Sequence, residues 1–132
     1  MTTTPTDIAN LAMQINADVN YSTNAADRAV IGRAYYSAYH VGQQIITKYR
    51  LPFASSPVRG SHMKELTRLT ECKPSSTPDY ITVQSIGYMA SRTLNPHRVH
   101  ADYLINDPLP PSMKPEALAR VQKILENAKK IL

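Results

Sequence analysis

Apolar residues recur every three or four positions along most of the chain, and clusters of proline interrupt the pattern. The first such segment covers 6–19, with Thr6 placed to cap it, and the second covers 24–49, with Asn24 as its cap. The apolar face of the second segment consists of Ile31, Ala34, Tyr35, Ala38, Gly42, Ile45 and Tyr49. The pattern predicts two helices, the second of them long.

Proline and glycine place the next helix and the loop before it. Residues 51–60 contain two prolines and a glycine, which predicts a loop. Ser61 then stands where an N-cap is expected, and a short helix is predicted to end near Cys72.

Two proline-containing starts shape the following segment. Thr77, followed by Pro78 and an aspartate, has the residue order of a helix N-terminus, and this helix is predicted to reach about Leu94. Asn95 and Pro96 repeat the combination, and proline disfavours the helical conformation for the residue before it. Either one helix kinks here or a new short helix begins at Pro96.

The chain ends in one more amphipathic segment. Residues 105–115 hold four prolines and predict a loop, and residues 115–131 predict the last helix. No segment alternates with a period of two. We therefore expect an all-α protein, an up-and-down bundle of about five helices that forms a single domain over residues 1–132.

Composition narrows the class of protein. The chain has 132 residues, 42 % of them hydrophobic, which argues against a disordered chain. Cys72 is the single cysteine, so an internal disulfide and a cysteine-rich zinc site are excluded. No long apolar run and no signal-peptide pattern occur, so we expect a cytoplasmic protein with no membrane segment. The net charge of +5 permits a polyanionic partner such as RNA.

The stretch RTLNPHRVHADY, residues 92–103, concentrates groups that can act on a phosphate. It contains Arg92, His97, Arg98, His100, Asp102 and Tyr103. Two of its histidines are three residues apart and could share a metal, but only Asp102 is near enough to add a ligand, so no metal site is expected. The alternative without a function is an ordinary helix end, in which Arg98 and Asp102, four residues apart, form a surface ion pair.

A second polar set lies on the long predicted helix. Arg33, Tyr36, Ser37 and His40 are spaced by three and four residues, so they share one stripe beside the apolar face. An arginine among apolar neighbours needs an anionic partner, and Asp102 is the candidate. In the competing interpretation the tyrosines belong to the core and His40 is a buried, hydrogen-bonded histidine.

Three sequence pieces resemble one known family. GRAYYSAYH (32–40), RGSHMKELTRL (59–69) and RVHADY (98–103) resemble, in that order, the signature helix, the Gly-x-His step and the Ala-Asp-Tyr ending of HEPN domains (higher eukaryotes and prokaryotes nucleotide-binding). The resemblance covers about residues 8–132 and implies a helical bundle that pairs as a homodimer.

The resemblance also implies a chemistry. HEPN ribonucleases carry an Arg-x4-6-His motif, and Arg92 and His97 match it with four residues between them; Arg33 and His40 offer a rival match with six. Histidine can move the ribose 2′-OH proton, and an arginine fork can hold the phosphate. The implied function is a metal-independent endoribonuclease of toxin or phage-defence type, acting without a cofactor in a cleft shared by two protomers.

The same resemblance assigns roles to neighbouring residues and leaves other functions open. Arg98, His100 and Tyr103 would line the cleft, with Asp102 orienting Arg33 or Arg98. A non-catalytic subunit could use this cleft to bind nucleotide or RNA, or to dock a nucleotidyltransferase or antitoxin partner. A third possibility is a protein-interaction module without a ligand.

Overall fold

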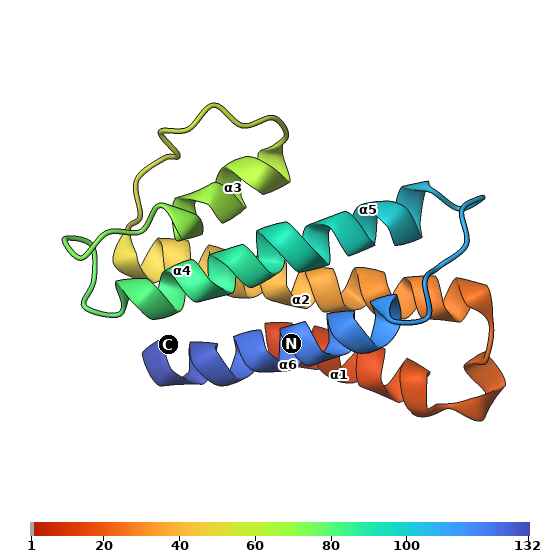
Figure 1. Cartoon of the computed structure of the whole chain (residues 1–132). Helices are drawn as coiled ribbons and strands as arrows, with labels where there is room; N and C mark the ends of the chain where they lie inside the picture. Colours follow the sequence, from red (N-terminus) through yellow and green to blue (C-terminus); the bar gives the residue numbers. More distant parts are fainter. Residues whose placement is uncertain (1) are drawn as a thin grey trace.

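The computed structural model describes residues 2–132, and every regular element in that range is helical. The α-helices are α1 (Pro5–Ala17), α2 (Asn24–Tyr49), α3 (Ser61–Thr70), α4 (Tyr80–Met89), α5 (Asn95–Tyr103) and α6 (Met113–Ile131), with a 3-10 turn at Val19–Tyr21 and a π-helical turn at Ala90–Leu94. Figure 1 shows α4, the π turn and α5 as one continuous rod, so the chain makes five rods. The expected all-α bundle of about five helices is confirmed.

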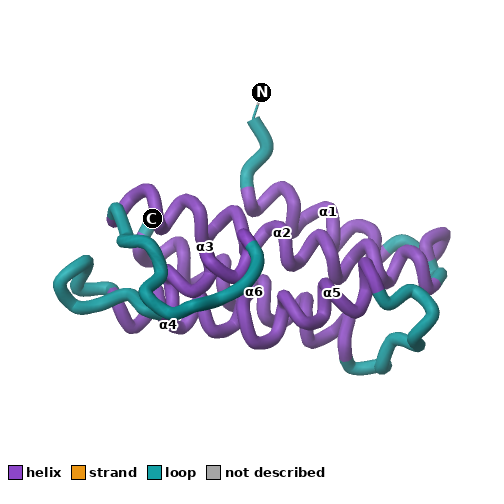
Figure 2. The backbone as a smooth tube through the Cα atoms, turned by 90° about the horizontal axis from the view of Figure 1, so that it is seen from above, coloured by secondary structure: helices purple, strands orange, loops and turns teal. Residues whose placement is uncertain are grey.

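Helix α2 runs through the centre and contacts all five other α-helices (Figures 1 and 2). The predicted apolar face of α2 is the face that is buried, apart from Tyr49 at its end, which stays partly exposed. The opposing side chains come from every other helix and form one core cluster with it. Each fully buried Leu or Ile contributes about 1.5–3 kcal/mol relative to an exposed one, so this shared core holds the rods together.

The start of α1 differs from the prediction. The helix begins at Pro5, and its N-cap is Thr4, not Thr6. The Thr4 hydroxyl accepts the Asp7 amide N–H at 3.1 Å, and the Asp7 carboxylate accepts the Thr4 amide N–H at 2.9 Å. This reciprocal pair satisfies two amides, and proline suits the first helical position, so the earlier start is favoured.

The N-caps of the next three helices also shift, by one or two residues. Thr23, not Asn24, caps α2, because its hydroxyl accepts the Ala26 amide N–H at 3.1 Å. Gly60 precedes α3 without a side-chain cap. Helix α4 begins at Tyr80, after Thr77 has accepted the Asp79 amide N–H in the preceding turn.

The chain stays helical through Pro96, and a π-helical turn precedes the proline. Asn95 has helical angles (φ −66°, ψ −45°), and its N–H donates to the carbonyl of Ala90, five residues back. Proline has no N–H to donate, and the wider π turn accommodates this without ending the helix. Burial of Leu94 and Ala101 on either side outweighs the local preference against helix at Asn95.

The loop at 51–60, predicted as such, is tied to α3. Arg68 donates to the carbonyls of Leu51 and Pro52. The Glu71 carboxylate accepts hydrogen bonds from the amides and hydroxyls of Ser55 and Ser56, which lowers the pKa of Glu71 to about 2. The loop therefore keeps a defined course past the start of α3 (Figure 2).

An arginine that the sequence did not single out fixes α5 against α2. Arg28 on α2 is 9 % exposed and donates to the carbonyls of His100, Ala101 and Leu104 at 3.1–3.2 Å, and to the carbonyl of Asp107 at 2.5 Å. These are the carbonyls at and just beyond the C-terminus of α5, where helix partners are missing and negative charge gathers. The contact holds the C-terminal end of α5 against α2.

Candidate functional site

Arg92 lies in the π turn and is exposed. Its guanidinium carbon is 4.2 Å from the centre of the Tyr88 ring, one helical turn earlier. Within residues 2–132 it forms no ion pair. It is therefore available to an anion from solvent.

His97 points elsewhere, toward α6. Its Nε2 is 3.5 Å from Glu116 Oε1, and this nitrogen is buried without a hydrogen bond to any described residue. His97 and Arg92 form no hydrogen bond with each other. Within the chain the two side chains have different neighbours, Tyr88 for Arg92 and Glu116 for His97.

The predicted contact between Arg33 and Asp102 is wrong. Arg33 is exposed, and the α2 residue that faces Asp102 is its neighbour Gly32: a Cβ built there would be 3.1 Å from Asp102 Oδ1. Packing through the glycine brings α2 and α5 close and leaves the Arg33 side chain on the adjacent surface. The buried arginine of α2 is Arg28, five residues earlier.

Arg33 instead lines a groove between α1 and α2. The groove also contains Tyr36, His40, Asp7 and Leu11 and has a volume of about 550 Å³. His40 is exposed, so its interpretation as a buried histidine is wrong as well. The stripe on α2 is partly a surface feature, with Ser37 as its buried member, donating to the carbonyl of Pro5 at 2.6 Å.

The second predicted partner of Asp102 is also wrong. Arg98 makes no ion pair with Asp102; its Nε and Nη2 donate to the side-chain oxygen of Asn95 at 3.4 and 3.1 Å. The Arg98 side chain turns back along the helix because Tyr35 offers its ring there, 4.7 Å from the guanidinium carbon. Asp102 stays exposed.

Arg98 is the centre of an aromatic cluster between α2, α3 and α5. The guanidinium carbon is also 6.0 Å from the Tyr36 ring and 5.6 Å from the Tyr103 ring. With His62 and Tyr39, which stack at 4.5 Å and 22°, these residues form one group. We call it the Arg98 cluster: Tyr35, Tyr36, Tyr39, His62, Arg98 and Tyr103.

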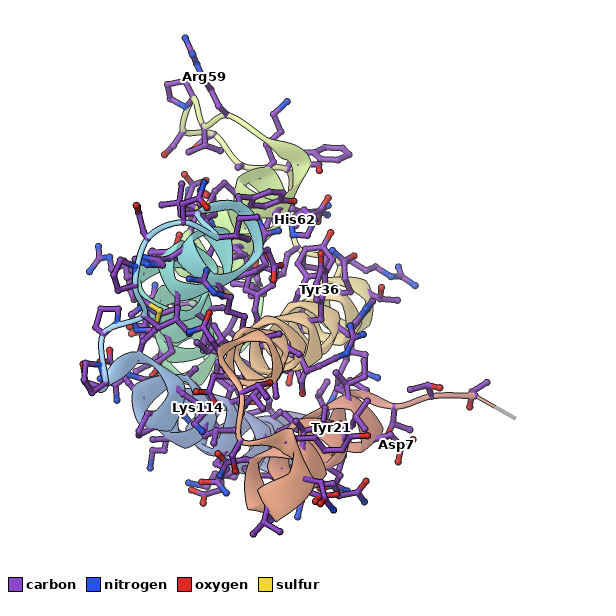
Figure 3. The ribbon with its side chains drawn as sticks, turned by 90° about the vertical axis from the view of Figure 1, so that its right-hand side faces the viewer. Asp7, Tyr21, Tyr36, Arg59, His62 and Lys114 are labelled. Carbon is purple, nitrogen blue, oxygen red and sulfur yellow. The ribbon has the colours of Figure 1, made fainter. Side chains whose placement is uncertain are left out.

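His62 joins this cluster from the start of α3. Its Nδ1 is 2.6 Å from the Tyr35 hydroxyl oxygen, and the two rings are stacked. In Figure 3 the side chains of His62 and Tyr36 face the space between α3 and α2. Burial lowers the pKa of His62, and the nearby Arg98 charge lowers it further. For Tyr35, burial has the opposite effect and raises the pKa far above its usual value.

The sequence singled out three of these six residues as candidates for the site: Tyr36, Arg98 and Tyr103. It placed Tyr35 in the core, where the structure also has it, and gave Tyr39 and His62 no role of their own. The Gly-x-His step at Gly60 and His62 was the one sequence signal that could have pointed to this histidine.

His100 and Tyr103 complete the end of α5. His100 Nε2–H donates to the carbonyl of Pro108 at 3.0 Å, which ties it to the following loop. Tyr103 is exposed and borders Arg98. Tyr103 is thus part of the cluster, and His100 is turned toward the loop.

The cluster offers hydrogen-bond donors and aromatic faces but no acid. Arg98 is 8 % exposed, yet no carboxylate among the described residues pairs with it. A buried cation without an acid partner is costly unless an anion or water compensates it. The arrangement is suited to holding an anionic group beside an aromatic ring.

The chain matches no model of a known protein family, no curated protein and no solved structure. No helix in the described part of the chain is long and apolar enough to cross a lipid bilayer. No group of three or more His, Cys, Asp or Glu side chains within residues 2–132 is arranged to hold a metal ion.

Proposed function

We propose that the protein binds RNA or a nucleotide at the Arg98 cluster. One observation carries the proposal: Arg98, a residue that is 8 % exposed, holds its guanidinium among tyrosine rings, and among the described residues only an amide oxygen accepts a hydrogen bond from it. Its Nη1 has no partner among residues 2–132 and is free to donate to a ligand.

The surrounding residues suit a nucleotide better than a simple anion. Arginine binds phosphate through parallel N–H donors, and tyrosine rings stack on nucleobases. Tyr36, Tyr39 and Tyr103 are half-buried or exposed, so their faces are within reach of a base. The net charge of +5 adds a favourable long-range field for a polyanion.

The test is a binding titration of single-stranded RNA and of a nucleotide with wild type and Arg98→Gln. Glutamine keeps part of the side-chain volume and can still contact Asn95, but it removes the charge and the fork. We expect at least about a tenfold loss of affinity, and a salt dependence of binding that is shallower by about one phosphate contact.

Arg59→Gln is the matched control. Arg59 is exposed at the tip of the 51–60 loop, pointing away from the cluster, so this variant loses the same charge elsewhere (Figure 3). Thermal unfolding of both variants checks that each is folded. Equal losses of affinity in the two variants would show that net charge, not the cluster, binds RNA.

A metal-independent ribonuclease is the second candidate, and the π turn favours it. π-helical turns are rare and frequent at functional sites, and this one presents Arg92 to solvent. Because His97 points toward α6, the pair would have to be assembled across a homodimer, with Arg92 of one protomer beside His97 of the other. The HEPN resemblance implies this function, a ribonuclease of toxin or phage-defence type. In that function an antitoxin or a nucleotidyltransferase can also be a partner of the chain.

Cleavage of single-stranded RNA in EDTA tests that candidate. The products should end in 2′,3′-cyclic phosphate, and a 2′-deoxy residue at the cut site should block the reaction. His97→Ala should lose about 10²–10⁴-fold in rate, since it removes general acid–base catalysis. Light scattering should report about twice 14.7 kDa. Wild type that binds RNA without cutting it, or that cuts as a monomer, contradicts this candidate and leaves the first one standing.

A further inference from the structure

The contact between Tyr35 and His62 determines which nitrogen of His62 carries the proton. Tyr35 is 0 % exposed, and burial keeps its hydroxyl protonated at neutral pH by raising its pKa. A buried hydroxyl needs an acceptor, and Nδ1 of His62, at 2.6 Å, is the one available among the described residues. The tyrosine therefore donates, and Nδ1 accepts.

The outer nitrogen of His62 is consequently a donor. A neutral imidazole carries one proton, and with the Nδ1 lone pair occupied that proton is on Nε2. Nε2 has no hydrogen-bond partner within residues 2–132, and the residue is half-exposed. His62 thus presents an N–H that a ligand oxygen can accept, and in this form it has no lone pair free to take a proton.

This donor and the guanidinium pack on the same two tyrosine rings. The His62 ring centre is 5.6 Å from the Tyr35 ring centre and 6.1 Å from that of Tyr36, and the Arg98 guanidinium carbon is 4.7 and 6.0 Å from the same two centres. The Arg98 charge also lowers the pKa of His62, so the two groups are close enough to interact. The cluster therefore contains two kinds of donor: a permanently charged guanidinium from α5 and a neutral N–H from α3.

The charge of the site can be counted from the groups that face it. Arg98 contributes one positive charge, burial raises the pKa of Tyr35 and so keeps its hydroxyl protonated, and the lowered pKa of His62 favours its neutral form. Asp102 follows on the same helix but makes no ion pair with Arg98. A single positive charge matches the single negative charge of an internal phosphodiester, whereas a terminal phosphate carries nearly two at neutral pH.

We infer that the Arg98 cluster takes an internal phosphodiester of single-stranded RNA, with Arg98 and the Nε2–H of His62 donating to its two non-bridging oxygens. Tyr35 acts as the positioning residue that holds His62 as a donor. The neighbouring tyrosine faces require unstacked bases, which single strands offer and duplexes do not. This inference rests on the proposed binding at Arg98 and adds the ligand class and the role of His62.

Two substitutions of His62 test the donor. His62→Gln keeps an N–H group near the position of Nε2, and His62→Phe keeps the ring that stacks on Tyr39 but has no donor. The probe is a single-stranded RNA of about eight nucleotides with hydroxyl ends and an internal dye, followed by fluorescence anisotropy. We expect His62→Gln to bind within about threefold of wild type and His62→Phe to bind about 10- to 100-fold more weakly.

The tautomer is measured directly by 15N NMR of the imidazole. Wild type should show Nε2 protonated and Nδ1 unprotonated at neutral pH, and Tyr35→Phe should show a mixture of the two tautomers with weaker RNA binding. Tyr21→Phe, at an exposed tyrosine beside α1, is the control and should change neither measurement (Figure 3).

The outcomes separate this inference from the proposed function. If Arg98→Gln binds RNA as wild type does, the proposed function fails and the inference fails with it. If Arg98→Gln is impaired while His62→Phe binds normally, or NMR finds the proton on Nδ1, the binding site stands and the donor role of His62 is overturned. If adenosine 5′-monophosphate competes at lower concentration than an unlabelled hydroxyl-ended oligonucleotide, the ligand is a terminal phosphate and the phosphodiester assignment is overturned.

Discussion

The two buried arginines of this protein are nearly equal in exposure, 9 % for Arg28 and 8 % for Arg98, but opposite in how they are satisfied. Arg28 donates to four backbone carbonyls and to the side chain of Asn24, so its donors are used inside the protein. Arg98 donates to one amide oxygen and otherwise contacts ring faces. Burial alone therefore does not tell whether an arginine uses its donors inside the protein or keeps some of them free, and the hydrogen-bond partners do.

The largest effect expected from this comparison is on stability. Arg28→Met keeps an apolar side chain of similar length but leaves the carbonyls at the end of α5 without their donor. We expect a loss of about 3–5 kcal/mol in the free energy of unfolding, because a charged group with several buried hydrogen bonds is removed. Urea denaturation measures it, with Arg120→Met on the exposed face of α6 as the control. A loss below about 1 kcal/mol would contradict the structural role of Arg28.

Arg98→Gln should weaken RNA binding strongly and lower stability only a little. Stability should fall by only about 1–2 kcal/mol, since cation–π contacts to the tyrosines are lost and no buried carbonyl is orphaned. RNA affinity should fall at least about tenfold, and Arg98→Lys should lie between wild type and glutamine because it keeps the charge without the fork. Denaturation and anisotropy on the same samples check the contrast; a destabilisation as large as that of Arg28→Met would make Arg98 structural too.

Replacing Arg98, but not Arg28, should change the pH dependence of stability. The pKa of His62 is lowered in the folded protein by burial and by Arg98. Below about pH 6.5 the unfolded chain therefore binds a proton that the folded chain does not, so stability falls as pH decreases through this range. Arg98→Gln should raise the folded-state pKa of His62, so the fall should end at a higher pH and be smaller, and His62→Gln should remove this contribution.

Denaturation curves at several pH values between about 5 and 7.5 measure this difference, with each variant compared with wild type at the same pH. Arg59→Gln should keep the wild-type pH profile. An unchanged profile in both Arg98→Gln and His62→Gln would show that His62 does not titrate as its surroundings imply.

Asp102→Asn should have the smallest effect. Asp102 is exposed and pairs with neither Arg33 nor Arg98, so removing its charge should change stability by less than about 0.5 kcal/mol. RNA affinity should be unchanged or slightly higher, because a negative charge near the cluster is lost. A large loss in either measurement would restore the predicted partnership of Asp102 and weaken the contrast between the two arginines.

The sequence predicted well where the helices lie along the chain. It predicted poorly how they are rotated about their own axes. Period and proline placement predicted every helical rod, because local propensity and burial agree there. The cap positions moved by one or two residues, since Thr4 and Thr6, or Thr23 and Asn24, are all acceptable caps locally and tertiary packing decides between them. The π turn escaped prediction because proline allows a break, a kink or a wider turn.

The candidate site was harder to predict because it depends on contacts between distant segments. Arg33 looked like the buried arginine of α2 by its neighbours, but the close approach through Gly32 puts it on the surface. Arg28, between Asp27 and Ala29, had no local sign of burial, since its partners are more than 70 residues away. His62 was visible only as part of a short resemblance, and Tyr35, which orients it, only as a core residue.

The π turn sets how α5 is rotated about its own axis relative to α4. An α-helix advances about 100° per residue, so a chain one residue shorter between Ala90 and Leu94 would run on as plain α-helix with α5 rotated by roughly that angle. Arg98 would leave the Tyr35 ring, and the end of α5 would no longer present its carbonyls to Arg28. The extra residue of the π turn thus keeps both Arg28 and Arg98 in contact with their partners.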